Sequence, residues 1–575
     1  MRTDVRRLLT LLAAGSLVAL GAPAAAGAAA ASGSTARSGL QRIDHLVVIY
    51  EENHSFDNLF GRWPGTNGLA GNPARTPRAT QVGPDPARTP YDCLLQVDVN
   101  LTSPPLSPVC TGTTPAGTAF ASHFTNRPFA ISDYIAPTDT TCPPPGVFAA
   151  NGVPKGTGLP GGCTRDLVHR FYNEQYQIDG GRMDRYSAGS DAAGLTQGYY
   201  DTRQLPVYRY LTGGHAPNYM VLDDFFQGAF GGSFLNHQWL IAARTPVFTG
   251  AVNDGGPTDL HSVVDGDGFP GSTPLHPTTG LKDAALTQAA NPDGSCLVRA
   301  GQPQPKPGTV CGDWAVNTIQ PAYQPYAPGA PVERRLPPQS YPTIGDRLSA
   351  EDVSWAWYAG GWDNANGNTA GRGWTNGSTP GVCTDPATLA TAVYPNCADK
   401  LFQFHHQPFN YFAAYAPGTA ARDAHLKDER DFLHSAQIGA LPAVSFVKPI
   451  GGENEHPGYT SVTAGEQHLV DLVRAIESGP EADSTAIVVT YDEFGGQWDH
   501  VPPPTAAGVS DEWGPGTRLP TLVISNLLPR SGVSSLPSDT TSILATIEAR
   551  YGLAPLSTRD ASVHTLAPLF ARAGG

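Results

Sequence analysis

The sequence predicts an α/β fold built around a central, mostly parallel sheet. Short apolar runs typical of buried strands lie near both ends of the chain, at 43–50 and 486–491. A further strand-like run at 443–447 is followed by an amphipathic helix and then by the run at 486–491. Strand, helix and strand in that order indicate a parallel crossover unit. Because strands so distant in sequence have to share one sheet, we expect a single domain over residues 40–572.

The individual elements follow from local patterns. The predicted strands are IDHLVVIY (43–50), AVSFV (443–447), AIVVTY (486–491) and LPTLVIS (519–525). The helix after 443–447 is expected to begin at a Thr463 N-cap, with Glu466 as its capping-box partner. Its apolar face consists of Leu469, Leu472, Val473 and Ile476, and Gly479-Pro480 ends it.

The first 31 residues have the pattern of a secretory signal peptide. Arg2, Arg6 and Arg7 precede an apolar run at 8–21, and the alanines at 24–26 fit a cleavage site. The Arg6-Arg7 pair is also compatible with twin-arginine export. An uncleaved anchor is the alternative, but the apolar run is too short for a permanent span. We therefore expect a secreted protein with no permanent membrane anchor after signal cleavage.

The eight cysteines fit an oxidising compartment. They fall into four sequential pairs, which predict the disulfides Cys93–Cys110, Cys142–Cys163, Cys296–Cys311 and Cys383–Cys397. A thiolate metal site is disfavoured because no C-x-x-C spacing occurs. Two stretches rich in Pro, Gly and Thr, at about 62–165 and 250–340, lack apolar periodicity. We interpret them as disulfide-pinned loop insertions that cover the site.

The charge pattern restricts the binding partners. The formal net charge is −15, and the basic residues do not cluster. This argues against a nucleic-acid-binding protein, because phosphate backbones are bound by clustered Lys and Arg. The sequence indicates no protein partner.

Oxygen-bearing side chains follow two predicted strands. Glu52 and Asn53 come after the first strand, and Asp492 and Glu493 come after the strand at 486–491. Ligands of open parallel sheets bind at the carboxyl ends of strands. Adjacent carboxylates repel each other unless a cation neutralises them, and oxygen ligands suit a hard divalent cation. A helix N-cap at Asn53 and an acidic surface turn at 492–493 are the structural alternatives.

A candidate nucleophile is Ser233, in the segment GGSFLNH. Glycines before a serine allow a tight approach, and a helix beginning there would favour an anion at its N-terminus. A plain turn is the alternative. The segment is not a G-x-S-x-G elbow, and the chain has no P-loop pattern.

Four histidines stand near predicted strand ends or in aromatic surroundings: His169, His405, His406 and His456. A lone histidine is usually a surface or core residue. Several at likely strand ends favour a polar centre, because imidazole binds metal and imidazolium neutralises phosphate or protonates a leaving alkoxide.

Taken together, these segments resemble a known family. IDHLVVIYEENHSFDNLFG resembles the opening signature of the phosphoesterase family that contains bacterial phospholipases C and AcpA-type acid phosphatases. Further segments resemble later blocks of that family and occur in the same order. They are DLVHRFYNEQYQIDGGRMDRY, GGSFLNHQWLIAA, TIGDRLSAEDVSWAWYAGGW, FHHQPFNYF, and the segments from AVSFVKPIGGENEHP to YDEFGGQWDHVPPP. The resemblance covers nearly the whole mature chain and leaves out only the two insertions.

The resemblance implies an alkaline-phosphatase-like α/β/α sandwich that hydrolyses phosphate esters through a serine nucleophile, which is Ser233. It implies one divalent metal ion, whether Ca, Mg, Mn, Fe or Zn, with the ligands Glu52, Asn53, Ser233, Asp492 and Glu493. The implied phosphate-binding residues are His169, Asn236 and Asn53, and the candidates for protonating the leaving group are His405, His406 and His456. Family members often carry two aspartates where this chain has Asp492-Glu493.

Three functions remain open at this stage. We expect a phosphomonoesterase of the acid-phosphatase type acting on a small phosphate ester. The first alternative is a phospholipase C, or another phosphodiesterase, acting on phospholipid head groups. For a choline head group, Trp355, Trp357, Tyr358 and Trp362 could form an aromatic cage, with core packing as the other interpretation. The second alternative is a non-catalytic secreted binding protein that kept the fold.

Overall fold

The computed structural model describes residues 39–69, 75–97, 107–136, 138–141, 163–317, 323–327 and 329–571. The signal peptide predicted for residues 1–31 and the predicted disulfide partner Cys142 lie outside these residues.

An eight-stranded sheet forms the centre of the fold. Its order is β11 (Leu426–Asp428), β10 (Trp355–Ala359), β12 (Val444–Lys448), β1 (His45–Glu51), β13 (Thr485–Tyr491), β14 (Thr521–Ile524), β6 (Tyr219–Leu222) and β15 (Gly532–Ser534). Only β14 runs against the other strands of this sheet. The predicted α/β fold with a mostly parallel central sheet is confirmed.

All four runs predicted to be strands enter this sheet, as β1, β12, β13 and β14. Strand β1 lies between β12 and β13, and its Val48 stands opposite Phe446 on one side and Val488 on the other. Every residue of β12, β13 and β14 is buried. Helices on both faces of the sheet account for these continuous apolar runs.

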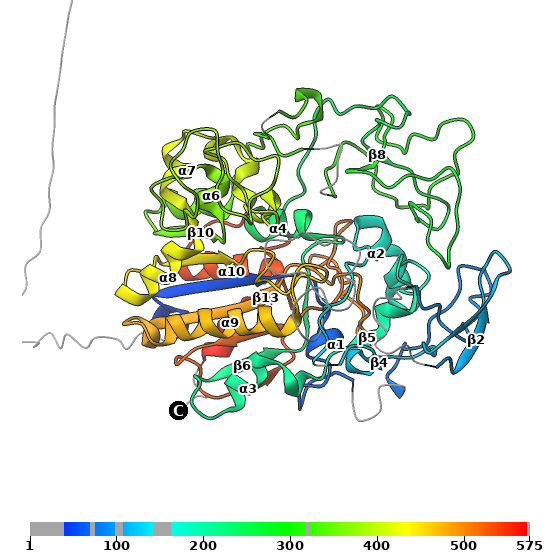
Figure 1. The fold of residues 1–575 in the computed structure, drawn as a ribbon, viewed down its shortest axis with the longest axis horizontal. Coiled ribbons are helices and arrows are strands. Elements are labelled where there is room, and N and C mark those ends of the chain that lie inside the picture. The colour runs from blue at the N-terminus through cyan, green and yellow to red at the C-terminus, as the bar shows by residue number, and fades with distance from the viewer. Residues whose placement is uncertain are drawn as a thin grey trace, which may run out of the picture. The chain divides into compact units, whose positions relative to one another are not determined.

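Helices cover both faces of the sheet. Helices α3 (Pro206–Thr212), α8 (Glu429–Ile438) and α9 (Val462–Glu477) pack side by side on one face, which is turned to the viewer in Figure 1. Helices α4 (Ser233–Ala242), α5 (Ile344–Ala350) and α10 (Thr540–Tyr551) form a second group, in which α4 contacts both others.

The start of α9 differs from the prediction. Ser461, and not Thr463, is the N-cap, and its side chain accepts a hydrogen bond from the Ala464 amide. Glu466 is buried, and its Oε2 accepts a hydrogen bond of 2.8 Å from the Val207 amide at the start of α3. Glu466 therefore serves the contact between two helices instead of a capping box.

The remaining elements are short. They are α1 (Phe56–Leu59), α2 (Phe171–Ile178), α6 (Trp362–Asn366), α7 (Ala420–His425), β2 (Cys110–Thr113), β3 (Ala119–Ser122), β4 (Phe129–Ala130), β5 (Gly198–Tyr199), β7 (Phe225–Phe226), β8 (His261–Ser262), β9 (Leu286–Gln288) and β16 (Ser538–Asp539). In Figure 1 the segments around α2, β2, β4, β5 and β8 lie beyond the end of the sheet toward which β1 runs.

Three of the predicted disulfides are confirmed: Cys93–Cys110, Cys296–Cys311 and Cys383–Cys397. The aromatic residues considered for a choline cage, Trp355, Trp357, Tyr358 and Trp362, are instead buried by 95% or more in and beside β10. Their role is therefore core packing. Among the described residues, no helix combines the length and the apolar character needed to span a bilayer.

Candidate active site

The carboxyl ends of β1 and β13 bring the predicted cation ligands together. The two strands are parallel neighbours, so the residues that follow them emerge side by side. The backbone amide of Asn53 donates to Oδ1 of Asp492 at 3.3 Å. The hydroxyl of Ser233, at the start of α4, donates to Oε2 of Glu52 at 3.1 Å and lies 3.4 Å from Oδ1 of Asn53.

The carboxylates among these residues are buried, and hydrogen bonds do not satisfy all of their oxygens. Burial raises the pKa of Asp492 well above its usual value, and the charge of Glu52 raises it further. Burial likewise raises the pKa of Glu493, followed by the charge of Asp492. Oδ2 of Asp492 and Oε1 of Glu493 are buried and have no hydrogen-bond partner among the residues described. Unpartnered buried carboxylate oxygens are what a cation would bind, so the donor set fits a divalent metal ion.

A strained backbone sets the position of these ligands. Asn53 has a φ of +61°, in the left-handed region. Gly495 follows the carboxylate pair with a φ of +62°, and a Cβ atom there would lie 2.1 Å from the Asn53 carbonyl oxygen. Only glycine fits this approach, and a strained residue beside charged groups is typical of functional sites.

The turn before Ser233 is fixed by two buried side chains. Glu174 accepts the Gly231 amide at 2.6 Å. Asn236 accepts the Ala229 amide at 2.9 Å through Oδ1, and its Nδ2 donates to the Gly231 carbonyl at 3.1 Å. The polar atoms of Asn236 are thus occupied by the backbone of the turn. Asn236 is not among the residues that line the cavity described next, so the phosphate-binding role indicated by the sequence stays a prediction.

A cavity of about 490 Å³ opens onto Ser233. All four predicted histidines line it, namely His169, His405, His406 and His456. Part of its wall comes from the segment predicted to be the second insertion, through Phe269, Gly271, Ser272, Thr273, Asp283, Val316 and Asn317. The structure therefore joins the nucleophile candidate and the histidines in one chamber.

Two of these histidines are neutral at neutral pH. Burial lowers the pKa of His405 well below its usual value. Burial also lowers the pKa of His406 to about 4, although the charge of Glu52 opposes this. Nε2 of His406 lies 2.8 Å from Oε1 of Glu52. On the other side of the site, Nε2 of His456 lies 3.0 Å from Nδ2 of Asn53.

Residues 43–554 match the sequence profile of the Phosphoesterase family. The chain belongs to the phosphoesterase family. It is accordingly a hydrolase that acts on phosphoric ester bonds. Phospholipase C A of Mycobacterium tuberculosis H37Rv is 24% identical over 550 residues, which cover 89% of this chain and 74% of that protein. A non-hemolytic phospholipase C of Pseudomonas aeruginosa is 31% identical over 201 residues, which cover 29% of this chain and 28% of that protein.

Among solved structures, a phosphonate monoester hydrolase of Silicibacter pomeroyi is similar over a small part of the phosphoesterase. The matched part covers 20% of this chain and 21% of that one, at 16% identity and a TM-score of 0.14. A likeness this small carries no argument about mechanism.

Two buried residues of the phosphoesterase site were missed in the sequence. Nζ of Lys448 lies 2.7 Å from Oε1 of Glu52 and donates to the Tyr50 carbonyl at 2.9 Å. Its signal was available, because Lys448 directly follows the predicted strand at 443–447. His237 stands one helical turn after Ser233, and its Nδ1 lies 2.8 Å from the Ser233 carbonyl.

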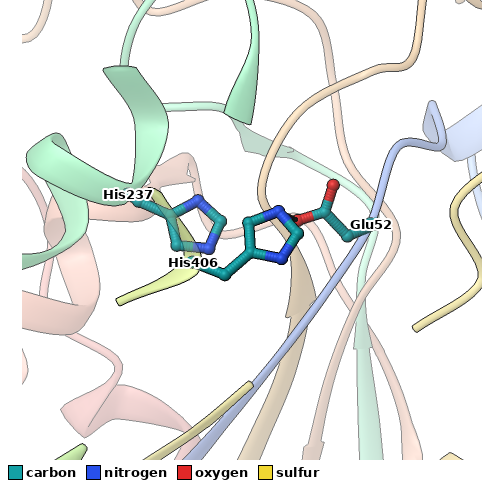
Figure 2. Close-up of side chains that lie close together, drawn as sticks. All are labelled: Glu52, His237 and His406. Carbon is teal, nitrogen blue, oxygen red and sulfur yellow. Dashed lines mark ion pairs between the residues drawn. The ribbon is translucent and has the colours of Figure 1, made fainter. Parts of the chain in front are cut away.

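His237 belongs to a row of side chains that leads to the carboxylates of the phosphoesterase site. Figure 2 shows His406 between His237 and Glu52. The rings of His237 and His406 stack with centroids 5.0 Å apart. Burial lowers the pKa of His237 well below its usual value. The row thus presents neutral imidazoles, which can accept hydrogen bonds or bind a metal.

Proposed function

We propose that the chain is a secreted, metal-assisted phosphoesterase in which Ser233 is the nucleophile. The observation that carries the proposal is the position of the Ser233 hydroxyl, which borders the cavity while it donates to Oε2 of Glu52 at 3.1 Å. Ser233 is the first residue of the ten-residue helix α4. The positive end of the helix dipole therefore favours a phosphate at this oxygen.

A divalent cation would fit between Glu52, Asn53, Asp492, Glu493 and the Ser233 oxygen. When bound, it supplies the positive charge that lowers the pKa of the serine hydroxyl and neutralises a phosphate oxygen. Glu52 accepts the hydrogen bond of the hydroxyl, which leaves the lone pairs of Ser233 Oγ available for bonding to phosphorus. Lys448 and His406 both contact the other oxygen of Glu52, which keeps that carboxyl ionised and fixed.

The reaction proceeds in two displacements. The Ser233 hydroxyl gives its proton to water in the cavity, and Oγ forms a bond to phosphorus while the bond to the leaving ester oxygen breaks. The phosphoryl group, with its head group in the case of a diester, is then bound to Ser233, and a protonated histidine gives its proton to the leaving alkoxide. A water molecule then attacks phosphorus and gives one proton to that histidine, the Oγ–phosphorus bond breaks, and Ser233 takes up a proton from water.

Of the three histidines predicted to protonate the leaving group, we favour His456. His406 is held by Glu52, and His405 is neutral at neutral pH. Nδ1 of His456 donates to the Pro457 carbonyl at 2.7 Å, and Nε2 lies 3.0 Å from Nδ2 of Asn53, so Nε2 has to take up a proton before it can protonate the leaving alkoxide. His169, which lines the cavity, remains a candidate for holding phosphate oxygens. Asn53 remains one as well, because its Oδ1 lies 3.4 Å from the Ser233 hydroxyl, although it does not line the cavity.

For the substrate, we favour a phosphodiester with a polar head group over the monoester expected first. The two relatives described above are both phospholipases C. The cavity wall also bears the carboxylates of Asp166, Asp191 and Asp283. Arg165 pairs with Asp191 and Arg170 pairs with Asp283, which leaves Asp166, beside His169, without an arginine partner among the described residues. Acidic side chains favour a head group that carries a positive charge over a second phosphate.

The test compares p-nitrophenyl phosphorylcholine with p-nitrophenyl phosphate, each with and without a chelator. We expect faster turnover of the diester, and loss of both activities with chelator and in Ser233→Ala. Faster turnover of the monoester would favour the acid-phosphatase type. Turnover of neither ester by the metal-loaded wild type would leave only the non-catalytic binding protein.

Export is part of the proposal. Disulfides persist in oxidising compartments outside the cytoplasm, and three are present among the described residues. Mass spectrometry of the protein recovered from the culture medium tests this part. We expect a mature N-terminus near residue 31.

A further inference from the structure

A second group of titratable side chains lies near the catalytic carboxylates. Its members are Glu51, Glu429, Glu453 and His468. Glu51 is the last residue of β1, and Glu52 follows it directly. Glu52 contacts Ser233, whereas the charged groups that act on Glu51 include His468 on α9 and Glu429 at the start of α8. This group shares no residue with the proposed catalytic ligands.

Three of these side chains converge. Nε2 of His468 lies 3.1 Å from Oε1 of Glu429 and 3.8 Å from Oε2 of Glu453. The three ligand atoms all lie within 4.8 Å of one another. They come from three segments, namely α8, the loop after β12, and α9. One ion placed among them would therefore tie two helices to a loop.

The group also contains buried oxygens without partners. Glu429 is 4% exposed, and its Oε2 has no hydrogen-bond partner within the described part of the chain. Glu51 is completely buried, and neither of its carboxylate oxygens has a hydrogen-bond partner among the described residues. A buried carboxylate without a partner is costly, so a positive charge is expected nearby. Lys448 acts on Glu51, but its ion pair is with Glu52, and Lys448 does not contact Glu429 or Glu453 among the ion pairs of the described residues.

We propose that Glu429, Glu453 and His468 bind a divalent transition-metal ion, Zn²⁺ or Mn²⁺. One imidazole nitrogen with carboxylate oxygens is a ligand set that such ions accept, whereas Ca²⁺ prefers oxygen ligands alone. The ion has a structural role. It holds the loop that carries Glu453, and this loop also carries His456 of the catalytic cavity.

The test counts metal ions in the full-length protein after chelation, dialysis against Zn²⁺ or Mn²⁺, and removal of free metal. Glu453→Gln and His468→Gln are expected to bind one ion fewer per chain than the wild type. Glu453 has a side chain that is 42% exposed, so its substitution leaves the fold intact. Asp471→Asn, which removes an exposed carboxylate from the same helix, is the control and keeps the wild-type count.

The Asp492→Asn background separates this site from the catalytic one. In that background, addition of Glu453→Gln should still remove one ion and should reduce the rise in melting temperature that Zn²⁺ produces. This readout does not depend on activity, so it stands apart from the proposed function. Equal ion counts with and without Glu453→Gln, in both backgrounds, would overturn the proposal and show that protons alone occupy the cluster.

Discussion

Nζ of Lys448 lies 2.7 Å from Oε1 of Glu52, and both side chains are completely buried. Burial raises the pKa of Glu52, but His406 and Lys448 lower it more, so that the net pKa falls well below its usual value. The pair therefore supplies a permanently ionised Glu52. Lys448 comes from β12 and Glu52 follows β1, so the pair also joins the ends of two neighbouring strands.

Replacement of Lys448 by methionine should be severe. Removal of one partner of a buried ion pair costs about 3–5 kcal/mol of stability, because the other charge is left uncompensated. We expect Lys448→Met to lower the urea midpoint and to abolish activity. The exposed Lys306→Met serves as the control and should leave both unchanged. A wild-type urea midpoint in Lys448→Met would contradict the pairing.

Asn236 offers a test of positioning against binding. Its side chain bonds the turn before Ser233 and does not line the cavity. In Asn236→Ala the loss of these hydrogen bonds should lower the free energy of unfolding by about 1–3 kcal/mol, because buried partners are left unsatisfied. Steady-state kinetics should show a lower kcat with little change in KM. A rise in KM alone would instead support the phosphate-binding role predicted from the sequence. Asn526→Ala, an exposed asparagine, is the control.

Gly495 should tolerate no side chain. A Cβ atom there would lie 2.1 Å from the Asn53 carbonyl oxygen, so Gly495→Ala has to displace Asn53. We expect loss of metal-dependent activity together with destabilisation. Gly381→Ala is the matched control, because Gly381 also has a positive φ of +78° but has free space around it. The control should show only the strain of about 1–2 kcal/mol expected for a left-handed residue. Equal effects of the two substitutions would show that strain, and not displacement of Asn53, is responsible.

The surroundings of His261 predict that the local stability of residues 259–263 depends on pH. Its two ring nitrogens lie 2.8 Å from carboxylate oxygens of Asp259 and Asp313. Burial lowers the pKa of His261, but these two hydrogen bonds raise it more, so the net pKa is raised. A histidine whose pKa is higher in the folded state stabilises fully below its unfolded pKa of about 6.5, and this contribution is lost as pH rises through the folded pKa.

Hydrogen-exchange protection factors of residues 259–263 would measure this effect. We expect them to fall as the pH rises above about 6.5, and to be independent of pH over the same range in His261→Gln. The same pH dependence in the variant would exclude His261 as its cause.

The sequence allowed the sheet to be predicted well, because fully buried strands leave short apolar runs that few other structures produce. The cap of α9 was predicted wrongly, since Ser461 and Thr463 have equivalent side chains and only the contact of Glu466 with α3 distinguishes them. The interpretation of the aromatic residues in and beside β10 as a choline-binding cage was likewise excluded only by their burial in the structure. The pattern of an aromatic strand does not show which of its faces is exposed.

At the site, residues next to strand ends were predicted and residues bound through tertiary contacts were not. Glu52 and Asp492 follow recognisable strands, and their side chains do meet around Ser233. Asn236 was predicted as a site residue, but its bonds to the turn before Ser233 were not. Lys448 follows a predicted strand, but its ion pair with Glu52 depends on a distant segment. The positions of all these residues support the proposed chemistry, while their roles remain predictions.

The most direct test of the central claim is to trap the covalent intermediate. Metal-loaded enzyme would be mixed with substrate, quenched in acid within one turnover, digested and analysed by mass spectrometry. The proposed mechanism predicts a phosphoryl group on Ser233 in the wild type and none in Ser233→Ala. A phosphoryl group on a histidine, or sustained turnover in Ser233→Ala, would contradict it.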